Sequence, residues 1–312
     1  MRERNSDHRR SGRPGQPRKP GGPAEPGRKP FDKGRAAGQA KAYAKPHTKP
    51  HAKGHVRRFG KPKAASWRGS ARDRDDMVVL YGWHSVKAAL ANPERKFHRL
   101  LTTENAARRL AEDGIKPAIE PEMVPADAIV ALVGAEAVHQ GLYAEADPLP
   151  SPDLEDVAKD GVLLVLDQIT DPHNVGAIMR SAAAFDVKAV VTTVRHSPDA
   201  TGALAKAASG ALEYVPIVTV PNLARALDEL KELYVQLVGL DSSGEADLAT
   251  AALTAPLALV IGAEGKGLRH LTRTHCDIVA RLALPGRIKS LNVSNATALA
   301  LYMATSKLTL PA

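Results

Sequence analysis

Three segments of the chain combine polar side chains and glycines in patterns that suit catalysis. The first, DQITDPHNVGAIMRSAAAF, places Asn174 at the start of a predicted helix and Arg180 six positions further along. Asn174 offers an amide that both donates and accepts hydrogen bonds, and Arg180 offers a planar fork that suits phosphate. Taken alone, this segment favours a simpler interpretation, in which Asn174 caps the helix and Arg180 is a surface charge.

The second segment, GAEGKGL, sets three glycines around a carboxylate and an amine: Gly262, Glu264, Gly265, Lys266 and Gly267. It lacks both the G-x-G-x-x-G order of a dinucleotide-binding fold and the lysine of a Walker loop. Closely spaced glycines let backbone N–H and C=O groups approach a ligand, although an ordinary turn between strand and helix also needs them.

The third segment, LPGRIKSLNVSNATALALYMATSKL, gathers small hydrogen-bonding side chains just before a predicted helix over 296–307. These side chains are Ser290, Asn292, Ser294 and Asn295. The pattern fits a ligand site as well as it fits a doubly capped helix start.

Regular alternation of strands and helices predicts how these segments are held. Apolar runs predict strands over 162–166, 187–192, 214–220, 234–240, 257–261 and 277–284. Near-continuous apolar runs are typical of parallel strands covered on both faces. We therefore expect an open α/β sheet with its ligand at the carboxyl ends of the strands, where the first two segments follow their strands.

The chain upstream divides into parts of different composition. A smaller α/β unit is predicted over about 77–146, and the proline-rich, acidic stretch ADPLPSPDLEDVAKDG after it reads as a linker. The expected domains are residues 1–76, 77–150 and 151–312.

Residues 1–76 are rich in proline and glycine, and we expect them to be disordered. They carry 22 Lys and Arg against 7 Asp and Glu, a net charge of +15, whereas residues 77–312 carry 21 against 27, a net of −6. Aromatic residues interleaved with this charge favour contact with nucleic acid, and a purely solubilising tail is the alternative.

Several classes of protein are excluded or disfavoured. The single cysteine, Cys276, permits neither an internal disulfide nor a multi-cysteine zinc site, so we expect no metal and a reducing, cytoplasmic compartment. No apolar run approaches 18 residues, so no membrane span is expected. A nucleophilic serine in a G-x-S-x-G elbow is also absent from the sequence.

Together, in this order and spacing, the three segments resemble the motifs of the SpoU (TrmH-type) family of RNA ribose 2′-O-methyltransferases, within the SPOUT superfamily. The stretches LYGWHSVKAAL and VHQGLYAEA are similar to the small L30e-type RNA-binding domain found in the 23S rRNA guanosine-2′-O-methyltransferase branch. The resemblance covers roughly 77–312 and overturns the simpler interpretation of each segment.

The resemblance implies a methyltransferase domain with a deep trefoil knot near its C-terminus, an exception to the rule that chains do not thread loops. The knot would bind S-adenosylmethionine, with Gly262, Leu282 and Leu291 at the cofactor. The family's active-site positions fall on Asn174, Arg180, Glu264, Ser290 and Asn292. Members are typically homodimers that act on RNA.

One departure from the family pattern is visible, because its usual Ile-Pro pair is replaced by Leu282-Ala283. Backbone contacts to the cofactor near 282–286 are therefore expected to shift slightly. The role of Arg180 stays open between a general base and a clamp on phosphate and developing alkoxide. Two other functions also stay open: the same chemistry on tRNA, and a non-catalytic RNA-binding or ribosome-assembly factor.

Overall fold

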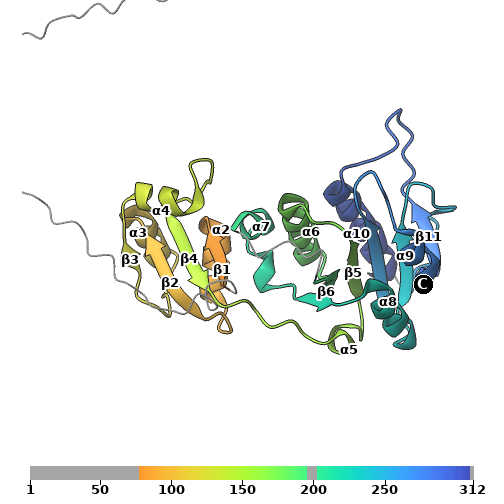
Figure 1. Ribbon diagram of the computed structural model, residues 1–312, viewed down its shortest axis with the longest axis horizontal. Coiled ribbons are helices and arrows are strands. Elements are labelled where there is room, and N and C mark those ends of the chain that lie inside the picture. The colour runs from red at the N-terminus through yellow and green to blue at the C-terminus, as the bar shows by residue number, and fades with distance from the viewer. Residues whose placement is uncertain (1–76, 195–201, 310–312) are drawn as a thin grey trace, which may run out of the picture. The chain divides into compact units, whose positions relative to one another are not determined.

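The computed structural model describes residues 77–194 and 202–309. Two sheets organise this part of the chain, one of four strands and one of seven (Figure 1). The disorder expected over residues 1–76 lies outside the described residues.

The four-stranded unit (residues 77–147) is built on the strand order β1-β4-β2-β3. Its strands are β1 (Val78–Tyr81), β2 (Phe97–Thr102), β3 (Glu122–Met123) and β4 (Leu142–Ala146), with β4 antiparallel to β1 and β2. Three helices complete it: α2 (Trp83–Ala91), α3 (Glu104–Glu112) and α4 (Ala126–Val133). The strands and helices together make the α/β unit that the sequence predicts over about 77–146.

The seven-stranded sheet is parallel throughout, as the apolar runs predicted, with the order β7-β6-β5-β10-β8-β11-β9. Its strands are β5 (Val162–Asp167), β6 (Ala189–Thr193), β7 (Ile217–Val220), β8 (Gln236–Leu240), β9 (Ala246–Asp247), β10 (Leu257–Gly262) and β11 (Ile278–Arg281).

Alternate side chains of each central strand enter separate cores on the two faces of this sheet. Leu164 and Leu166 of β5 join the core formed with α6 (Pro172–Ala184) and α10 (Val293–Thr309). Leu163 and Val165 join the core on the other face, formed with α8 (Leu223–Glu232). The remaining helices are α5 (Leu154–Val157), α7 (Gly202–Ala208), the 3-10 turn η1 (Ala211–Glu213) and α9 (His270–His275).

Three details differ from the sequence-based expectation. The predicted linker contains α5, whose buried Leu154 anchors it to the core on the α8 face. The strand expected over 214–220 starts only at Ile217. The N–H groups of Tyr214 and Val215 donate to the Ala211 carbonyl in the turn that closes η1, and Pro216 has no N–H to donate. The strand expected over 277–284 ends at Arg281, where its two-residue partner β9 ends.

Candidate active site

The carboxyl ends of four neighbouring parallel strands meet at one edge of the seven-stranded sheet. Gly262 at the end of β10 pairs with Asp167 at the end of β5, and β8 and β11 follow on the other side of β10. The loops after these strands carry all three predicted segments. The three segments therefore follow the carboxyl ends of neighbouring parallel strands.

The glycine turn after β10 folds tightly back on itself. The Gly267 N–H donates to the Ala263 carbonyl at 2.9 Å, and Gly265 and Gly267 have φ values of 77° and 65°. A Cβ at Gly262 would lie 2.2 Å from the Gly267 carbonyl carbon, so a side chain there would collide with backbone. The glycines are therefore required by the fold of the turn.

Two carboxylates hold this turn against the sheet. Asp167, whose side chain is fully buried, accepts the Arg269 backbone N–H at 3.1 Å and its Nε–H at 2.6 Å. Asp241, just after β8, accepts the Leu268 N–H at 3.2 Å. Neither residue was predicted from the sequence, although an acidic side chain at the end of an apolar strand is a pattern that could have identified both.

Hydrogen bonds from Ser243 and Leu268, together with the charge of Arg273, set the ionisation of Asp241. Burial is the largest single influence and opposes the charged form, but these donors outweigh it and the pKa of Asp241 falls below its ordinary value. The carboxylate therefore remains charged at the turn.

The first and third segments meet through a direct contact between Asn174 and Asn292. The Asn292 Nδ2–H donates to the Asn174 Oδ1 at 3.0 Å. Asp171, not Asn174, caps α6 by accepting the N–H groups of His173 and Asn174. The Asn174 amide is thus available to a neighbour, and the structure brings together two residues 118 positions apart in the sequence.

Asn292 also orders the start of α10. Its Oδ1 accepts the Ser294 N–H at 2.9 Å and the Ser294 hydroxyl at 2.6 Å, so its oxygen caps the helix while its nitrogen reaches Asn174. Asn292 therefore fulfils the capping interpretation of this segment and also contacts the first segment.

Arg180, Glu264 and Ser290 are exposed at this edge. Within residues 77–194 and 202–309, none of the three has a hydrogen-bond or ion-pair partner. The structure therefore does not join Arg180 to Asn174 or Glu264.

Leu282 and Leu291 line a cavity of about 130 Å³ together with Ser290. Its other walls are Leu240, Asp241, Ser242, Ala280, Leu284, Lys289 and Ala296. Among the hydrogen bonds of the described residues, none uses the backbone N–H of Leu282 or Leu291. Apolar walls with free backbone donors suit a nucleoside that is recognised through the main chain. Gly262 does not line this cavity. Its part is to permit the tight turn after β10.

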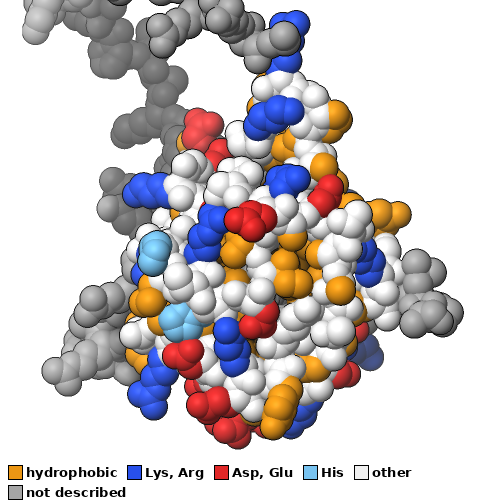
Figure 2. Space-filling model, turned by 90° about the vertical axis from the view of Figure 1, so that its right-hand side faces the viewer, with side chains coloured by type: hydrophobic (Ala, Val, Ile, Leu, Met, Phe, Trp, Pro, Cys, Tyr) orange, Lys and Arg blue, Asp and Glu red, His pale blue; other side chains and the backbone are white. Residues whose placement is uncertain are grey.

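Charge around the site is mixed. Figure 2 shows the face that carries α9 and β11, where Lys and Arg side chains are interspersed with Asp and Glu. Burial raises the pKa of Cys276 to about 12, so its thiol is not a nucleophile at neutral pH. Among the described residues, no group of His, Cys, Asp or Glu side chains could hold a metal ion, and no helix is long and apolar enough to cross a membrane.

Comparison with known proteins places the chain in a family. Residues 161–302 match the SpoU rRNA Methylase family, and residues 79–152 match the family described as RNA 2′-O ribose methyltransferase substrate binding. The 23S rRNA (guanosine-2′-O-)-methyltransferase RlmB of Ralstonia nicotianae is 39% identical over 235 residues, which cover 72% of this chain and 94% of that protein. The RlmB of Xylella fastidiosa is 40% identical over 232 residues, covering 72% and 90%.

A solved structure is similar over much the same region. The SpoU methyltransferase AviRb from Streptomyces viridochromogenes, in complex with the cofactor AdoMet, has a TM-score of 0.63 and 25% identity over 76% of this chain and 92% of that one. The fold, the spacing of the motifs and these relatives agree, and the chain belongs to the SpoU rRNA methylase family of methyltransferases.

Proposed function

We propose that this protein transfers a methyl group from S-adenosylmethionine to the ribose 2′-hydroxyl of a guanosine in 23S rRNA. The observation that carries the proposal is the Asn174–Asn292 contact, which joins two family motifs at the sheet edge that also holds the cavity lined by Leu282 and Leu291. The names of the RlmB relatives supply the RNA and the nucleotide.

The cavity fits the cofactor in its chemistry. Leucine side chains would cover the adenine ring, and the free N–H groups of Leu282 and Leu291 would bind its polar atoms. The cofactor, when bound, supplies an electrophilic methyl group on a sulfonium. Gly262 and the turn that follows it would shape the neighbouring wall, within the trefoil knot that we propose for the C-terminal part of the chain.

Arg180 is the residue that we assign to the reacting hydroxyl. Its exposed guanidinium would hold the adjacent phosphate and stabilise the developing alkoxide. A guanidinium pKa above about 12 opposes full deprotonation, so we favour this clamp over a general base. Asn174 and Asn292 would fix the floor of the site, and Ser290 and Glu264 would orient the ribose and the Arg180 fork once RNA is bound.

The described part of the chain would work as two domains, residues 77–150 for RNA and residues 151–312 for catalysis. The match of residues 79–152 to a substrate-binding family supports the first assignment. The rRNA substrate supports a cytoplasmic location.

We also infer a homodimer that uses the outer face of α10. Leu299 and Tyr302 on this face are 43% and 62% exposed, and the Tyr302 ring contacts Phe185 at 6.5 Å between centroids. Burying such side chains against a second copy would remove apolar surface from water. An active site completed across that interface is the arrangement that we expect.

Two measurements test the function. Calorimetry should detect stoichiometric binding of S-adenosylmethionine by the purified protein without RNA, and no binding at millimolar cofactor would refute the enzyme assignment. Mapping of 2′-O-methyl groups in total RNA from a strain that lacks the gene should show one guanosine of 23S rRNA losing its methyl group. Loss of a methyl group from tRNA instead would refute the rRNA assignment.

A further inference from the structure

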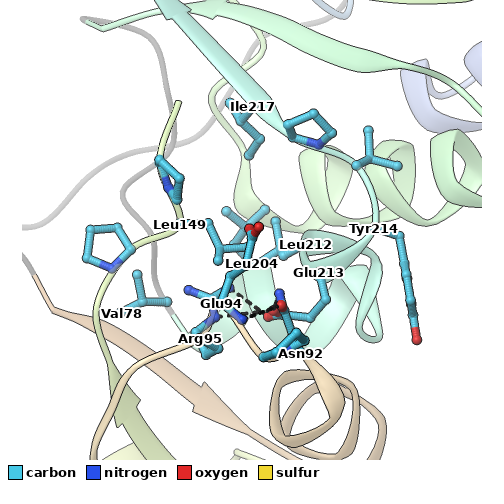
Figure 3. Close-up of a pocket in the computed structure, with 15 residues that line it drawn as sticks. Val78, Asn92, Glu94, Arg95, Leu149, Leu204, Leu212, Glu213, Tyr214 and Ile217 are labelled. Carbon is cyan, nitrogen blue, oxygen red and sulfur yellow. Dashed lines mark hydrogen bonds and ion pairs between the residues drawn. The ribbon is translucent and has the colours of Figure 1, made fainter. Parts of the chain in front are cut away.

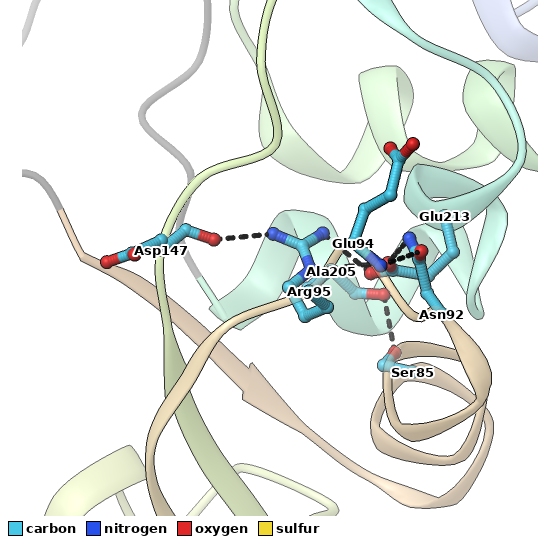
Figure 4. Close-up of polar contacts among 7 residues, drawn as sticks. All are labelled: Ser85, Asn92, Glu94, Arg95, Asp147, Ala205 and Glu213. Atoms are coloured by element: carbon cyan, nitrogen blue, oxygen red, sulfur yellow. Dashed lines mark hydrogen bonds and ion pairs between the residues drawn. The ribbon is translucent and has the colours of Figure 1, made fainter. Parts of the chain in front are cut away.

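A buried ion pair joins the four-stranded unit to η1, away from every residue assigned to catalysis. Arg95 lies just before β2 and Glu213 ends η1, and their side chains are only 3% and 2% exposed. The Arg95 Nη2–H donates to Glu213 Oε1 at 2.6 Å and its Nε–H donates to Oε2 at 3.2 Å (Figure 4). Because two hydrogen bonds join the guanidinium to the carboxylate, they fix the relative orientation of the two side chains as well as their distance.

The remaining polar atoms of the pair are also engaged. The Asn92 Nδ2–H donates to Glu213 Oε2 at 2.8 Å, and the Arg95 Nη1–H donates to the Asp147 carbonyl at 2.8 Å. Charges are costly to bury unless each is paired and hydrogen-bonded, and here both are. The network joins the C-cap of α2, the turn before β2 and the residue after β4 to Glu213, the last of them through Arg95.

Close backbone packing surrounds the pair on one side. The Ser85 hydroxyl donates to the Ala205 carbonyl of α7 at 2.6 Å. A Cβ at Gly202 would lie 2.4 Å from the Tyr81 ring, and a Cβ at Gly210 would lie 2.8 Å from the Ala88 Cβ. The segment of α7 and η1 therefore forms a platform on which β1 and α2 rest.

On the other side of the pair, packing is replaced by a cavity of about 530 Å³. Its walls include Pro148 and Leu149 of the connecting segment, Leu212 of η1 and Ile217 of β7 (Figure 3). Because apolar side chains do not fill this space, this side of the junction is held by the Arg95–Glu213 pair together with Leu212, which packs against the cores of both units.

The platform leads directly to the catalytic helix. A Cβ at Gly176 of α6 would lie 2.4 Å from the Ala207 Cβ and 2.9 Å from the Ala208 N of α7, so the two helices touch at their backbones. Helix α6 carries Asn174 and Arg180. Because close-packed interiors are hardly compressible, a shift of α7 would displace α6 as well.

We propose that the Arg95–Glu213 pair is a specificity-determining contact, which sets the position of the RNA-binding unit relative to Arg180 and so selects the nucleotide that is methylated. This inference rests on the proposed function. Arg95 and Glu213 act as positioning residues, because they touch neither the cavity lined by Leu282 nor the reacting groups.

The test compares two isosteric losses of a carboxylate, Glu213→Gln and Asp113→Asn. Asp113 is the matched control, since it pairs with Lys87 on the exposed surface of the four-stranded unit. Hydrogen exchange of the full-length protein should increase in peptides covering 92–97, 147–153 and 202–216 for Glu213→Gln and stay unchanged for Asp113→Asn. This readout does not depend on methyl transfer.

Methylation of rRNA purified from a strain that lacks the gene supplies the second readout. Glu213→Gln should lower kcat/KM at the main position by about a hundredfold, as misplacement by an ångström does, and methylate neighbouring positions. The affinity for S-adenosylmethionine should stay within twofold. If the wild-type protein methylates no 23S rRNA, the proposed function fails, and that result is visible before any variant is compared.

A double variant, Arg95→Met with Glu213→Leu, distinguishes a specific effect of the ion pair from general unfolding of the protein. Apolar residues of similar volume can replace a buried ion pair without loss of stability, so this protein should regain slow exchange and a single methylated position. The proposal is overturned if Glu213→Gln keeps the exchange and the methylation pattern of Asp113→Asn, or if the double variant folds and holds the junction yet still methylates several positions.

Discussion

At the scale of single residues, Arg180 is an exposed cation on α6 that neutralises no carboxylate among residues 77–194 and 202–309. Within the described ranges no acidic side chain lies in ion-pair contact with it. An arginine held ready for a ligand fits this situation, since its charge is not already compensated.

Replacing Arg180 with alanine should reduce the rate of methyl transfer by about a thousandfold, the loss seen when one preorganised donor to a developing oxyanion is removed. Cofactor affinity should stay within a few-fold, because Arg180 is not part of the lining of the cavity with Leu282 and Leu291. Single-turnover rates and calorimetry would check both. Equal losses of rate and binding would make Arg180 a structural residue.

The Arg180→Lys variant separates the two roles of the side chain. A lysine keeps the charge but loses the rigid fork. We expect nearly complete inactivity, because a phosphate clamp needs the planar geometry. A variant that stays active with a shifted pH–rate profile would instead show that the side chain transfers a proton.

Gly262 offers a test of the turn. Gly262→Ala should destabilise the protein by about 1 to 3 kcal/mol, as overpacking does, and abolish cofactor binding, because the new Cβ would meet the Gly267 backbone. Gly286→Ala is the control for stability only, since nothing lies within 4 Å of a Cβ there but residues 282–286 are expected to contact the cofactor. Thermal unfolding and calorimetry measure the two effects. Identical thermal stability of the two variants would contradict the geometry described for the turn.

Asn174 and Asn292 were selected as site residues because the three motifs were read together, and the structure shows that their side chains are hydrogen-bonded to each other. Taken by itself, Asn174 suited a helix cap, and the cap proved to be Asp171, three positions earlier. Local spacing could not show that Asn174 meets Asn292, because that contact depends on the parallel order of β5, β10, β8 and β11. The roles of all the predicted catalytic and cofactor residues stay predictions.

At the scale of elements, Asp241 links the end of β8 to the turn after β10. Its pKa is lowered in the folded protein, so the carboxylate stabilises the fold above the pKa of about 3.9 that it has when unfolded. This stabilisation is lost as the pH falls through the folded-state value. Asp241→Asn should therefore cost about 1.5 to 3 kcal/mol at neutral pH, the worth of a hydrogen bond to a charged group, and less once the pH has fallen below the lowered pKa of Asp241.

Denaturant unfolding of wild type and Asp241→Asn across the acid range measures this difference. Asp156→Asn is the control, because Asp156 is an exposed residue paired with Lys159 at 3.4 Å and should leave the curve unchanged. A constant difference between wild type and Asp241→Asn at every pH would show that Asp241 acts through packing and not through its charge.

Strands that coincide with long apolar runs were predicted from the sequence, whereas the two-residue strands were not. The runs that became β5, β8 and β10 are buried on both faces, so hydrophobicity alone identified them. Strands β3 and β9 have two residues each and depend on their partners, which no local pattern encodes. The packing of α7 and η1 against β1 and α2 was also not predicted from the sequence. The requirement for glycine at positions 202 and 210 is visible only when Tyr81 and Ala88 are seen beside them.

At the scale of the whole molecule, charge is divided unequally along the chain. The sequence from residue 77 onward has a net charge of −6, and the face seen in Figure 2 mixes both signs. A surface of this kind attracts a polyanion only where cations gather locally. Residues 1–76, with a net charge of +15, are therefore the strongest candidate for general affinity toward RNA.

Deleting residues 1–76 should weaken RNA binding at moderate salt and flatten its salt dependence. Each phosphate neutralised by the tail adds somewhat under one unit to the slope of log affinity against log salt, so losing several contacts should lower the slope by several units. Maximal methylation at saturating RNA should survive, because every predicted catalytic residue lies beyond residue 76. The methylated position should also be unchanged, since phosphate contacts carry no base identity. Salt-titrated binding and site mapping of full-length and 77–312 protein provide the comparison. Equal slopes would reduce the tail to an aid to solubility, whereas a changed position would show that it takes part in recognition alongside the Arg95–Glu213 contact.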